Sequence, residues 1–550
     1  MHTITNSSGS GLMTMLLLLI LLAIPCDVLN AQIIQHSIIY DNIPDSEIKR
    51  AVDTSKLIIT GSNTKQMIQM KKIKAIKPDM IILLYEHAIG SYKPNSVVSG
   101  HEEWFAHGGD GTKRLIASKY GWYLMNISNK EWRDYISALI VKNTIDSGYD
   151  GIFMDDMWGQ YVEKFILEGS SDKGTPLDLP ITNWRKYIIM IMQAVREKYQ
   201  GWLFINSTEE EYMTYIDGFM FEGFIHGNSS SDASTLDQSS CLRGLNKVAR
   251  LQKYRKKLLL ASGTEGKDLQ LAKKWQNLCY LSYLLIQNEN TTFSFQQSPS
   301  YIFKNSVTNP VPHADLGKPL GEYFIVKEGQ GSQNLLPNGS FENGLSSWSI
   351  VSGLPTYEQE NGMHGGVVRF ISDGLKRRDM IRSHLIPVLA NGEYRIRLSV
   401  RANNNEPGTA DYMKLGLQGR FYDGDMKRIP GSYDLEFGKG SYDWQPYEVN
   451  YRAPSNAAYF QISIGFIGDG TGTGWLDNLY FGKAEKNEFV LERDFENGSV
   501  FVNYGDKEAT ISLQRMIPEF YRLDPGQGII VDKISSLPHG VSLILKGFSK

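Results

Sequence analysis

The first half of the chain alternates short apolar runs with longer amphipathic segments. Between residue 33 and about residue 296, runs rich in β-branched and aromatic residues are separated by segments with apolar residues at helical spacing, such as Trp132–Asn143 and Trp184–Tyr199. This alternation is typical of βα units, which build a parallel sheet. Eight runs predict eight strands: Ile33–Tyr40, Leu57–Thr60, Met80–Tyr85, Gly151–Asp155, Leu203–Asn206, Gly218–Glu222, Leu258–Ala261 and Thr292–Phe295.

Eight strands that alternate with helices predict an α/β fold in which residues 32–330 form a (β/α)8 TIM barrel, a fold of about 250 residues. A doubly wound open sheet is the alternative for the same alternation. Such sheets carry a glycine-rich fingerprint for a dinucleotide or a phosphate after one strand, and none follows any of the eight runs. The barrel is therefore the preferred prediction.

The pattern changes at Leu335, where strands of alternating polarity and glycine-rich turns begin. Runs such as Tyr394–Val400 and Tyr459–Phe466 place apolar residues at every second position. We predict a β-sandwich of the jelly-roll type over residues 331–485. The last segment, 486–550, is also β-rich but too short to bury a good core alone, so we expect a small C-terminal β-domain that packs on the barrel.

The N-terminus carries an apolar run, Leu12–Ile24, interrupted only by Thr14. The run is shorter than the about 20 residues of a bilayer span, and Ala31 offers a small residue for cleavage, so residues 1–31 predict a signal peptide. The mature protein is then expected to be secreted, periplasmic or on the cell surface. Lipidation at Cys26 is an alternative that would hold it on a membrane, although Pro25 stands where such a motif prefers a small residue.

The composition of the chain limits the kinds of binding partner and the role of disulfide bonds. A net charge of -3 over 550 residues predicts no field that would attract nucleic acid or an anionic membrane, so a neutral partner fits best. Aromatic residues make up 11% of the chain, which suits stacking on sugar rings. After signal cleavage Cys241 and Cys279 would be the remaining cysteines, too few for a disulfide framework. We expect a monomer.

Two matching segments, Asp150–Asp155 and Asp217–Glu222, carry the candidate chemistry. In each, Asp-Gly leads into a strand, three apolar residues cross the sheet, and an acid emerges at its C-terminal end. There the loops of a TIM barrel meet and its reacting groups lie. Paired carboxylates suit glycosidic cleavage, in which one protonates the leaving oxygen and the other is nucleophile or base. A single acid could instead cap a helix, but the pair favours Asp155 and Glu222 as catalytic residues.

Other residues would bind substrate at the same mouth. Asp156 competes with Asp155, because adjacent strand residues point to opposite faces. Glu86 directly follows the third predicted strand and Asn206 ends the fifth, and both would reach sugar hydroxyls; Trp158 is a candidate stacking platform. The sequence has no His-x-x-x-His or Cys-x-x-Cys spacing, so we expect no metal or other cofactor in catalysis.

A family resemblance is carried by Tyr123–Tyr135, Tyr149–Asp156 and Asp217–Glu222. These segments resemble the glycoside hydrolases catalogued as hypothetical glycosyl hydrolase family 15, which are related to the family 114 polygalactosaminidase barrels. The likeness covers about residues 33–325 and resumes at Glu492–Gly498. It implies a TIM barrel with a catalytic pair at the positions of Asp155 and Glu222.

The sandwich resembles carbohydrate-binding modules of the family 4 and 9 type through Asn338–Glu342, Trp348 and Trp475–Asp477. In such modules the first Glu and the late Asp help to hold a structural calcium ion, so the resemblance implies Glu342 and Asp477 as Ca²⁺ ligands; carboxylate oxygens suit that ion. Because the barrel likeness stops before this module and resumes after it, the module is expected to be inserted.

Two functions fit these patterns. The first is an exported glycoside hydrolase that cleaves O-glycosidic bonds of a polysaccharide or oligosaccharide with Asp155 and Glu222. The alternative is a non-catalytic secreted glycan-binding protein whose barrel has lost its activity. A barrel without activity need not keep both strand-end acids, so their presence favours the hydrolase.

Overall fold

The computed structural model describes most of the chain from residue 36 onward. The predicted signal peptide, 1–31 with Cys26, lies outside the described residues. Within them, none of the helices combines the length and the apolar character that a bilayer crossing requires. The described ranges are 36–39, 44–92, 94–107, 114–117, 121–159, 181–227, 238–264, 268–297, 316–328, 332–359, 365–410, 412–485, 488–505, 507–512, 519–521, 533–536 and 541–545.

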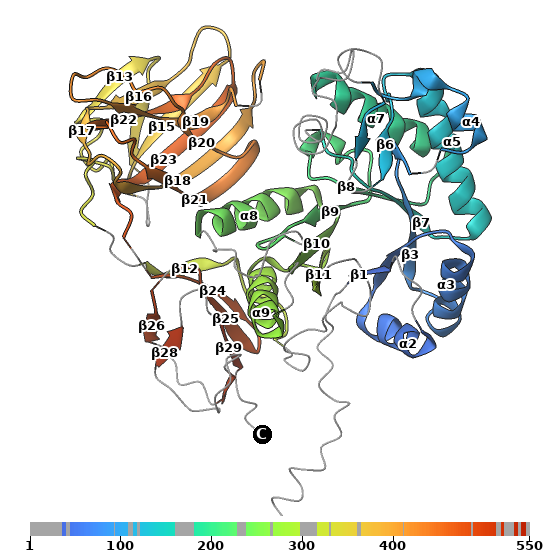
Figure 1. Ribbon diagram of the computed structural model, residues 1–550. Helices are drawn as coiled ribbons and strands as arrows, with labels where there is room; N and C mark the ends of the chain where they lie inside the picture. Colours follow the sequence, from blue (N-terminus) through green and yellow to red (C-terminus); the bar gives the residue numbers. More distant parts are fainter. Residues whose placement is uncertain are drawn as a thin grey trace, which may run out of the picture.

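Eight parallel strands form a nearly closed barrel in sequence order (Figure 1). They coincide within a few residues with the eight apolar runs, which confirms the predicted TIM-barrel fold class. The strands are β1 (His36–Ile39), β2 (Leu57–Thr60), β3 (Ile81–Glu86), β7 (Gly151–Met154), β8 (Trp202–Asn206), β9 (Gly218–Glu222), β10 (Lys257–Thr264) and β11 (Thr291–Gln297).

The first and last strands are joined through one buried histidine. The His36 ring forms hydrogen bonds with Thr292 Oγ1 at 2.8 Å through Nδ1 and with Ser294 Oγ at 2.9 Å through Nε2. Burial lowers the pKa of His36 to about 3, so the ring is neutral and uses one nitrogen as donor and the other as acceptor. A polar side chain thus links β1 to β11 where the barrel closes.

Helices cover the outside of the barrel, and their ends carry the expected caps. Asn63 begins α3 with a capping box, Asn129 begins α5 and Asp268 begins α9, each through its side-chain oxygen, while Gly148 ends α5 in the left-handed conformation. The longer helices are α2 (Asp45–Thr54), α3 (Thr64–Ile76), α5 (Lys130–Ser147), α7 (Ile181–Lys198), α8 (Gln238–Leu251) and α9 (Leu269–Ile286).

The alternation of side chains along each strand decides what reaches the barrel mouth. One residue in two points inward, and these residues form an interior cluster that includes Leu83, Phe153, Phe204 and Met220. Their strand neighbours, such as Ile152, pack against the helices instead. Two residues further along β3, β7, β8 and β9, the inward positions lie at the C-terminal mouth of the barrel.

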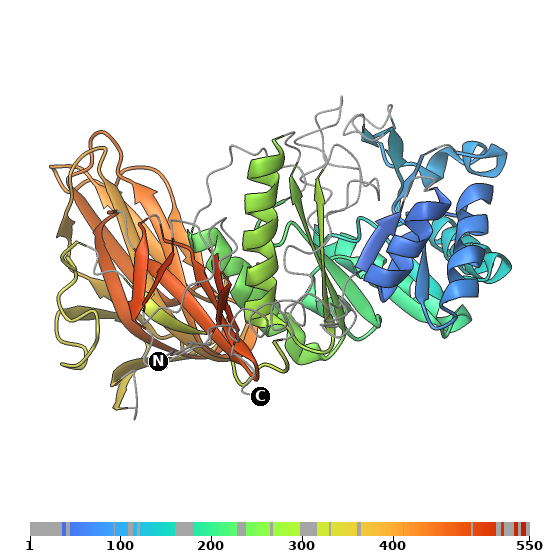
Figure 2. The same cartoon turned by 90° about the horizontal axis from the view of Figure 1, so that it is seen from below.

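The β-sandwich consists of two antiparallel sheets packed face to face (Figure 2). Inward-facing residues of both sheets, such as Phe370, Ile396, Leu417 and Ile464, form its core. One sheet contains β13 (Trp348–Ser352), β16 (Met380–Ser383), β17 (Ile386–Pro387), β22 (Tyr459–Phe466), β19 (Leu415–Tyr422) and β20 (Tyr433–Glu436). The other contains β14 (Thr356–Gln359), β15 (Gly366–Asp373), β23 (Thr471–Lys483), β18 (Glu393–Glu406) and β21 (Gly440–Arg452).

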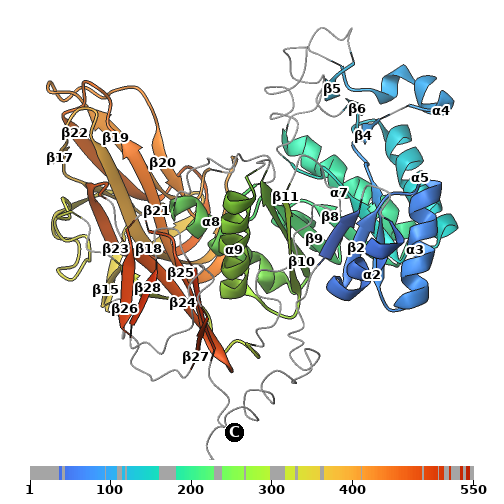
Figure 3. The ribbon, with the colours of Figure 1, turned by 60° about the horizontal axis from the view of Figure 1, so that its bottom comes forward.

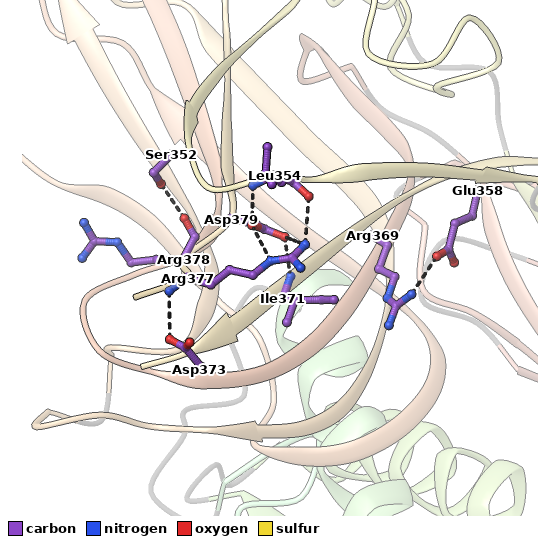
Figure 4. Close-up of polar contacts among 9 residues, drawn as sticks. All are labelled: Ser352, Leu354, Glu358, Arg369, Ile371, Asp373, Arg377, Arg378 and Asp379. Carbon is purple, nitrogen blue, oxygen red and sulfur yellow. Dashed lines mark hydrogen bonds and ion pairs between the residues drawn. The ribbon is translucent and has the colours of Figure 1, made fainter. Parts of the chain in front are cut away.

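A buried acid ties one end of the sandwich together (Figure 4). The side chain of Asp379 is fully buried and pairs with Arg377 at 2.9 Å. Its oxygens also accept backbone N–H groups of Leu354 at 2.7 Å and Ile371 at 2.8 Å. These bonds satisfy a charge that would otherwise be costly to bury, so Asp379 has a structural role.

The sandwich is inserted between two strands of one sheet. Strand β12 (Phe324–Glu328) precedes it, β24 (Phe489–Phe495) follows it, and the two pair antiparallel. Although β12 lies in the segment 32–330 that we predicted as barrel, it belongs to the C-terminal sheet, which also contains β25 (Gly498–Asn503), β29 (Val541–Leu545) and β27 (Glu519–Tyr521). The insertion therefore follows from strand pairing, which brings together segments far apart in the chain.

Both β-rich parts contact the barrel. Helix α8 lies against strand β21 of the sandwich (Figure 3), where Gln238 donates to Glu448 Oε2 at 2.9 Å and Asn246 donates to the Pro446 carbonyl at 2.8 Å. In the C-terminal sheet, Arg493 donates to the Leu284 and Gln287 carbonyls at the end of α9. These contacts fix the sandwich beside the barrel face that α8 covers.

Candidate active site

Two carboxylates meet at the barrel mouth, as the paired segments predicted. Asp155 follows the last residue of β7, and Glu222 ends β9. Between them, on β8, Asn206 donates its Nδ2 to Asp155 Oδ1 at 2.8 Å and to Glu222 Oε2 at 3.0 Å. Because the same nitrogen contacts both acids, the distance between Asp155 Oδ1 and Glu222 Oε2 cannot exceed the sum of the two hydrogen-bond lengths. The amide bridges the two acids.

Tyr85 is a further member of this site that sequence reasoning did not single out. It lies on β3, two residues beyond inward-facing Leu83, and its hydroxyl donates to Asp155 Oδ2 at 2.6 Å. The available signal was the alternation along the strand, which gives Tyr85, Asp155, Asn206 and Glu222 the same inward direction. A mouth lined by two acids, one amide and one phenol follows from this shared direction.

The electrostatics of Asp155 reflect its place between acids and donors. Burial raises the pKa of Asp155 above its usual value, and the neighbouring Asp156 carboxylate raises it further. His87 and the hydrogen bonds from Tyr85 and Asn206 act in the opposite direction. Each of these donors stabilises the ionised form of a carboxylate that burial alone would neutralise.

Asp156 takes a supporting position rather than the centre of the mouth. Its backbone has a φ of 57°, a left-handed conformation that is uncommon for a non-glycine residue. This turn directs the Asp156 carboxylate to His87 Nε2 at 2.8 Å, and the Asp156 N–H donates to Asp155 Oδ1 at 2.9 Å. The His87 ring packs 4.4 Å from the Trp122 ring. Asp156 therefore contacts His87, and its predicted role in substrate binding remains a prediction.

The structure corrects the predicted position of Glu86. Its Oε1 accepts a hydrogen bond from Asn143 Nδ2 of helix α5 at 3.1 Å, so the side chain lies between β3 and the helix layer. Burial there raises the pKa of Glu86 to about 7. The physical reason is strand alternation: Tyr85 points inward, and its neighbour must point outward. Glu86 therefore does not line the mouth with Asp155.

The tryptophans near the mouth differ in burial. Trp104, Trp122 and Trp132 are buried in the barrel's hydrophobic core. Trp158 is half-buried on the loop after β7, with Lys247 Nζ 6.0 Å from its ring centroid. Trp158 is thus the candidate that stays accessible for stacking on a sugar, which remains a prediction.

The implied calcium ligands lie on adjoining segments of the sandwich. Gly339 packs directly on the Leu479 carbonyl, which brings the Glu342 segment beside the Asp477 segment. Glu342 Oε1 accepts the Gly366 N–H at 3.3 Å, and the buried Asp477 accepts the Asn478 N–H. The one metal-type cluster of three His, Cys, Asp or Glu side chains found within the described ranges contains neither acid. Calcium binding by this pair stays a prediction.

Comparison with known proteins finds one family model and several solved structures that are similar to parts of the chain. The family described as hypothetical glycosyl hydrolase family 15 matches residues 74–335. The isomalto-dextranase of Arthrobacter globiformis T6 is 10% identical, over 83% of this chain and 97% of its own, with a TM-score of 0.35. A noncanonic maltogenic α-amylase of Thermotoga neapolitana is 10% identical, over 81% of this chain and 99% of its own, also with a TM-score of 0.35.

A third solved structure, a family 16 carbohydrate-binding module, is 16% identical, over 27% of this chain and 100% of its own, with a TM-score of 0.23. No curated protein matches the chain. The identification therefore rests on the family match. The match covers residues 74–335, which include β7, β8 and β9 with their acids, and it confirms the predicted resemblance of this segment to hypothetical glycosyl hydrolase family 15.

Proposed function

We propose that the protein is an exported glycoside hydrolase that cleaves a polysaccharide with Asp155 as nucleophile and Glu222 as general acid and base. The observation that carries this proposal is the Asn206 bridge, which holds the two acids close together. In retaining glycosidases the carboxyl groups are about 5–5.5 Å apart, whereas inverting enzymes need about 6.5–9.5 Å for an intervening water. One shared amide supports the shorter separation and hence retention of configuration.

The division of roles follows from the hydrogen bonds. Asp155 accepts from the Tyr85 hydroxyl, the Asn206 amide and the Asp156 N–H. These three donors oppose the rise in the pKa of Asp155 that burial and Asp156 produce, and so support the ionised carboxylate that a nucleophile must be. Glu222, on the other side of Asn206, is then the group that carries the proton. We propose this order of roles, which the paired sequence segments left open.

In the first step Asp155 attacks the anomeric carbon while Glu222 gives its proton to the leaving glycosidic oxygen, and a glycosyl ester forms on Asp155. In the second step the Glu222 carboxylate takes a proton from water. The water oxygen attacks the same carbon, the ester bond breaks, and Asp155 leaves as a carboxylate. The net reaction adds one water across one glycosidic bond and restores both side chains.

The test is cleavage of polysaccharides by the full mature chain, read as new reducing ends over a panel of bacterial, algal and plant polymers. Asp155→Asn and Glu222→Gln should each lower the rate by at least about 10³-fold, since each removes one required group. Glu86→Gln is the matched control, because it makes a similar change outside the mouth. For a substrate that is cleaved, proton NMR of the first-formed anomer should show retention.

Two outcomes would contradict the proposal. Cleavage that survives in Asp155→Asn or Glu222→Gln would remove that residue from the mechanism. Binding of polysaccharide with no cleavage by the unsubstituted protein would favour the non-catalytic glycan-binding alternative instead.

A further inference from the structure

A cleft of about 350 Å³ lies between the barrel and the sandwich. This volume lies within the about 300–1,000 Å³ of ligand sites. Thr208 and Glu209, just after β8, and helix α8 form the barrel wall, and Phe437–Lys439 contribute to the sandwich wall. Charged side chains dominate the lining. Four are glutamates, and six are cations: Arg185, Arg243, Lys247, Arg250, Lys414 and Lys439.

The glutamates of the cleft already have partners. Glu209 lies 3.5 Å from Arg185, and Glu436 lies 3.0 Å from Lys414. Glu211 lies 3.8 Å from Lys439, and Glu210 accepts the Tyr254 hydroxyl at 2.8 Å. Since each glutamate already has a partner and the cationic side chains are more numerous, the cleft carries an excess of positive charge.

Lys247 is the first cation without an acidic partner. Its ammonium group has no hydrogen bond or ion pair to any residue that the structure describes. It lies 5.0 Å from the ring centroid of Phe221 and 6.0 Å from that of Trp158. Burial lowers the pKa of Lys247, with Glu209 opposing this shift from a distance. A half-buried ammonium group that faces aromatic rings has its three N–H donors available to a ligand.

Arg250 is the second such cation. Its Nε is buried and, among the described residues, has no hydrogen-bond partner. The guanidinium packs against Gly438, where a Cβ would come within 2.6 Å of Nε, and lies 5.9 Å from the Tyr442 ring centroid. Gly438 therefore makes room for a guanidinium whose Nε has no partner among the described residues.

Lys247 lies near the C-terminal ends of two barrel strands. Phe221, whose ring centroid is 5.0 Å from the Lys247 ammonium group, precedes Glu222 on β9, and strand alternation turns Phe221 toward the helix layer and away from the mouth. Trp158, whose ring centroid is 6.0 Å from the same ammonium group, lies on the loop after β7, three residues beyond Asp155. The loop after β7 therefore connects the surroundings of Lys247 to Asp155.

We propose that the cleft is a subsite for an anionic group of the glycan, with Lys247 and Arg250 as its ligands. The group is a carboxylate or a sulfate ester, as in uronic acid or sulfated sugars, because an ammonium and a guanidinium both donate to such oxygens. The inference rests on the proposed function in that the same glycan chain would reach Asp155 and Glu222. This inference proposes an anionic glycan in place of the neutral partner that the net charge of the chain favoured.

The test measures binding to the full mature chain carrying Glu222→Gln, which prevents turnover. The probes are neutral, uronate and sulfated oligosaccharides of equal length, titrated by calorimetry at low salt. We expect one anionic probe to bind at least tenfold more tightly than the neutral one, and the better probe identifies the group. Lys247→Met should abolish this preference by weakening the binding of the anionic probe, whereas Lys247→Arg should retain it. Lys273→Met, an equal charge change on the exposed side of α9, is the control.

Equal binding of all three probes would overturn the inference, as would an anionic preference that survives Lys247→Met combined with Arg250→Met. A failure of the proposed function would give a different result: anionic probes would bind through Lys247, but the unsubstituted protein would cleave none of the polysaccharides. Cleavage that depends on Asp155, without any preference for anionic probes, would contradict the proposed anion-binding role of the cleft and leave the proposed function standing.

Discussion

The hydroxyl of Tyr85 on strand β3 donates to Asp155 at the end of strand β7, at 2.6 Å. The two strands are neighbours in the barrel, although 70 positions separate the two residues in the chain. This bond opposes the rise in the pKa of Asp155 that burial and Asp156 produce. Tyr85 thereby helps to keep the proposed nucleophile ionised.

Tyr85→Phe should therefore lower kcat/KM by about 10- to 100-fold, the cost of one hydrogen bond to a charged group. Without the bond the pKa of Asp155 rises further, so the limb on which activity increases with pH should move to higher pH. The pH profile of kcat/KM measures both effects. An unchanged acidic limb would show that Tyr85 does not control the ionisation of Asp155.

Asn206→Ala should remove the bridge between the two acids and lower kcat by at least about 10²-fold, since Asp155 and Glu222 would lose their shared donor. The effect should lie mainly in kcat rather than KM, because the amide positions reacting groups. Steady-state kinetics on a substrate found in the polysaccharide screen separates the two constants. A loss confined to KM would assign Asn206 to substrate binding, as the sequence predicted.

Glu86→Gln should make the protein less sensitive to pH. Folding raises the pKa of Glu86 from 4.5 to about 7, so its contribution to stability is fully present below pH 4.5 and is lost as the pH rises through 7. Glutamine keeps an acceptor for Asn143 and removes this loss. The melting temperature of Glu86→Gln minus that of the parent should be larger at pH 8 than at pH 4.5. An equal difference at both pH values would contradict the pKa shift.

Glu448→Gln should weaken the junction between the sandwich and the barrel. Glu448 is almost fully buried, pairs with Arg397 at 2.9 Å and Arg395 at 3.4 Å, and accepts from Gln238 of α8. Removing its charge leaves two arginines without their carboxylate, a loss of about 3–5 kcal/mol in the free energy of unfolding.

Urea unfolding measures this change. Glu436→Gln is the matched control, because that acid is 57% exposed in its pair with Lys414 and should cost at most about 1 kcal/mol. Equal losses in the two variants would show that the buried cluster adds nothing to the junction.

The sequence by itself determined the eight barrel strands and the positions of Asp155 and Glu222 on the fourth and sixth of them. Apolar runs and strand-end acids are local patterns, and a parallel barrel brings all strand C-termini to one face. The same local pattern misplaced Glu86, because the end of a strand does not reveal which of two adjacent residues points inward.

Only the tertiary structure decided which side chains touch. The Asn206 bridge needs β7, β8 and β9 side by side, and the Tyr85 bond needs β3 beside β7. The cationic cleft needs α8 and the inserted sandwich to face each other, so a net charge of -3 over the chain concealed it. Hydrogen bonds and local charge depend on distances of a few ångströms between segments far apart in the chain, and the fold alone sets those distances.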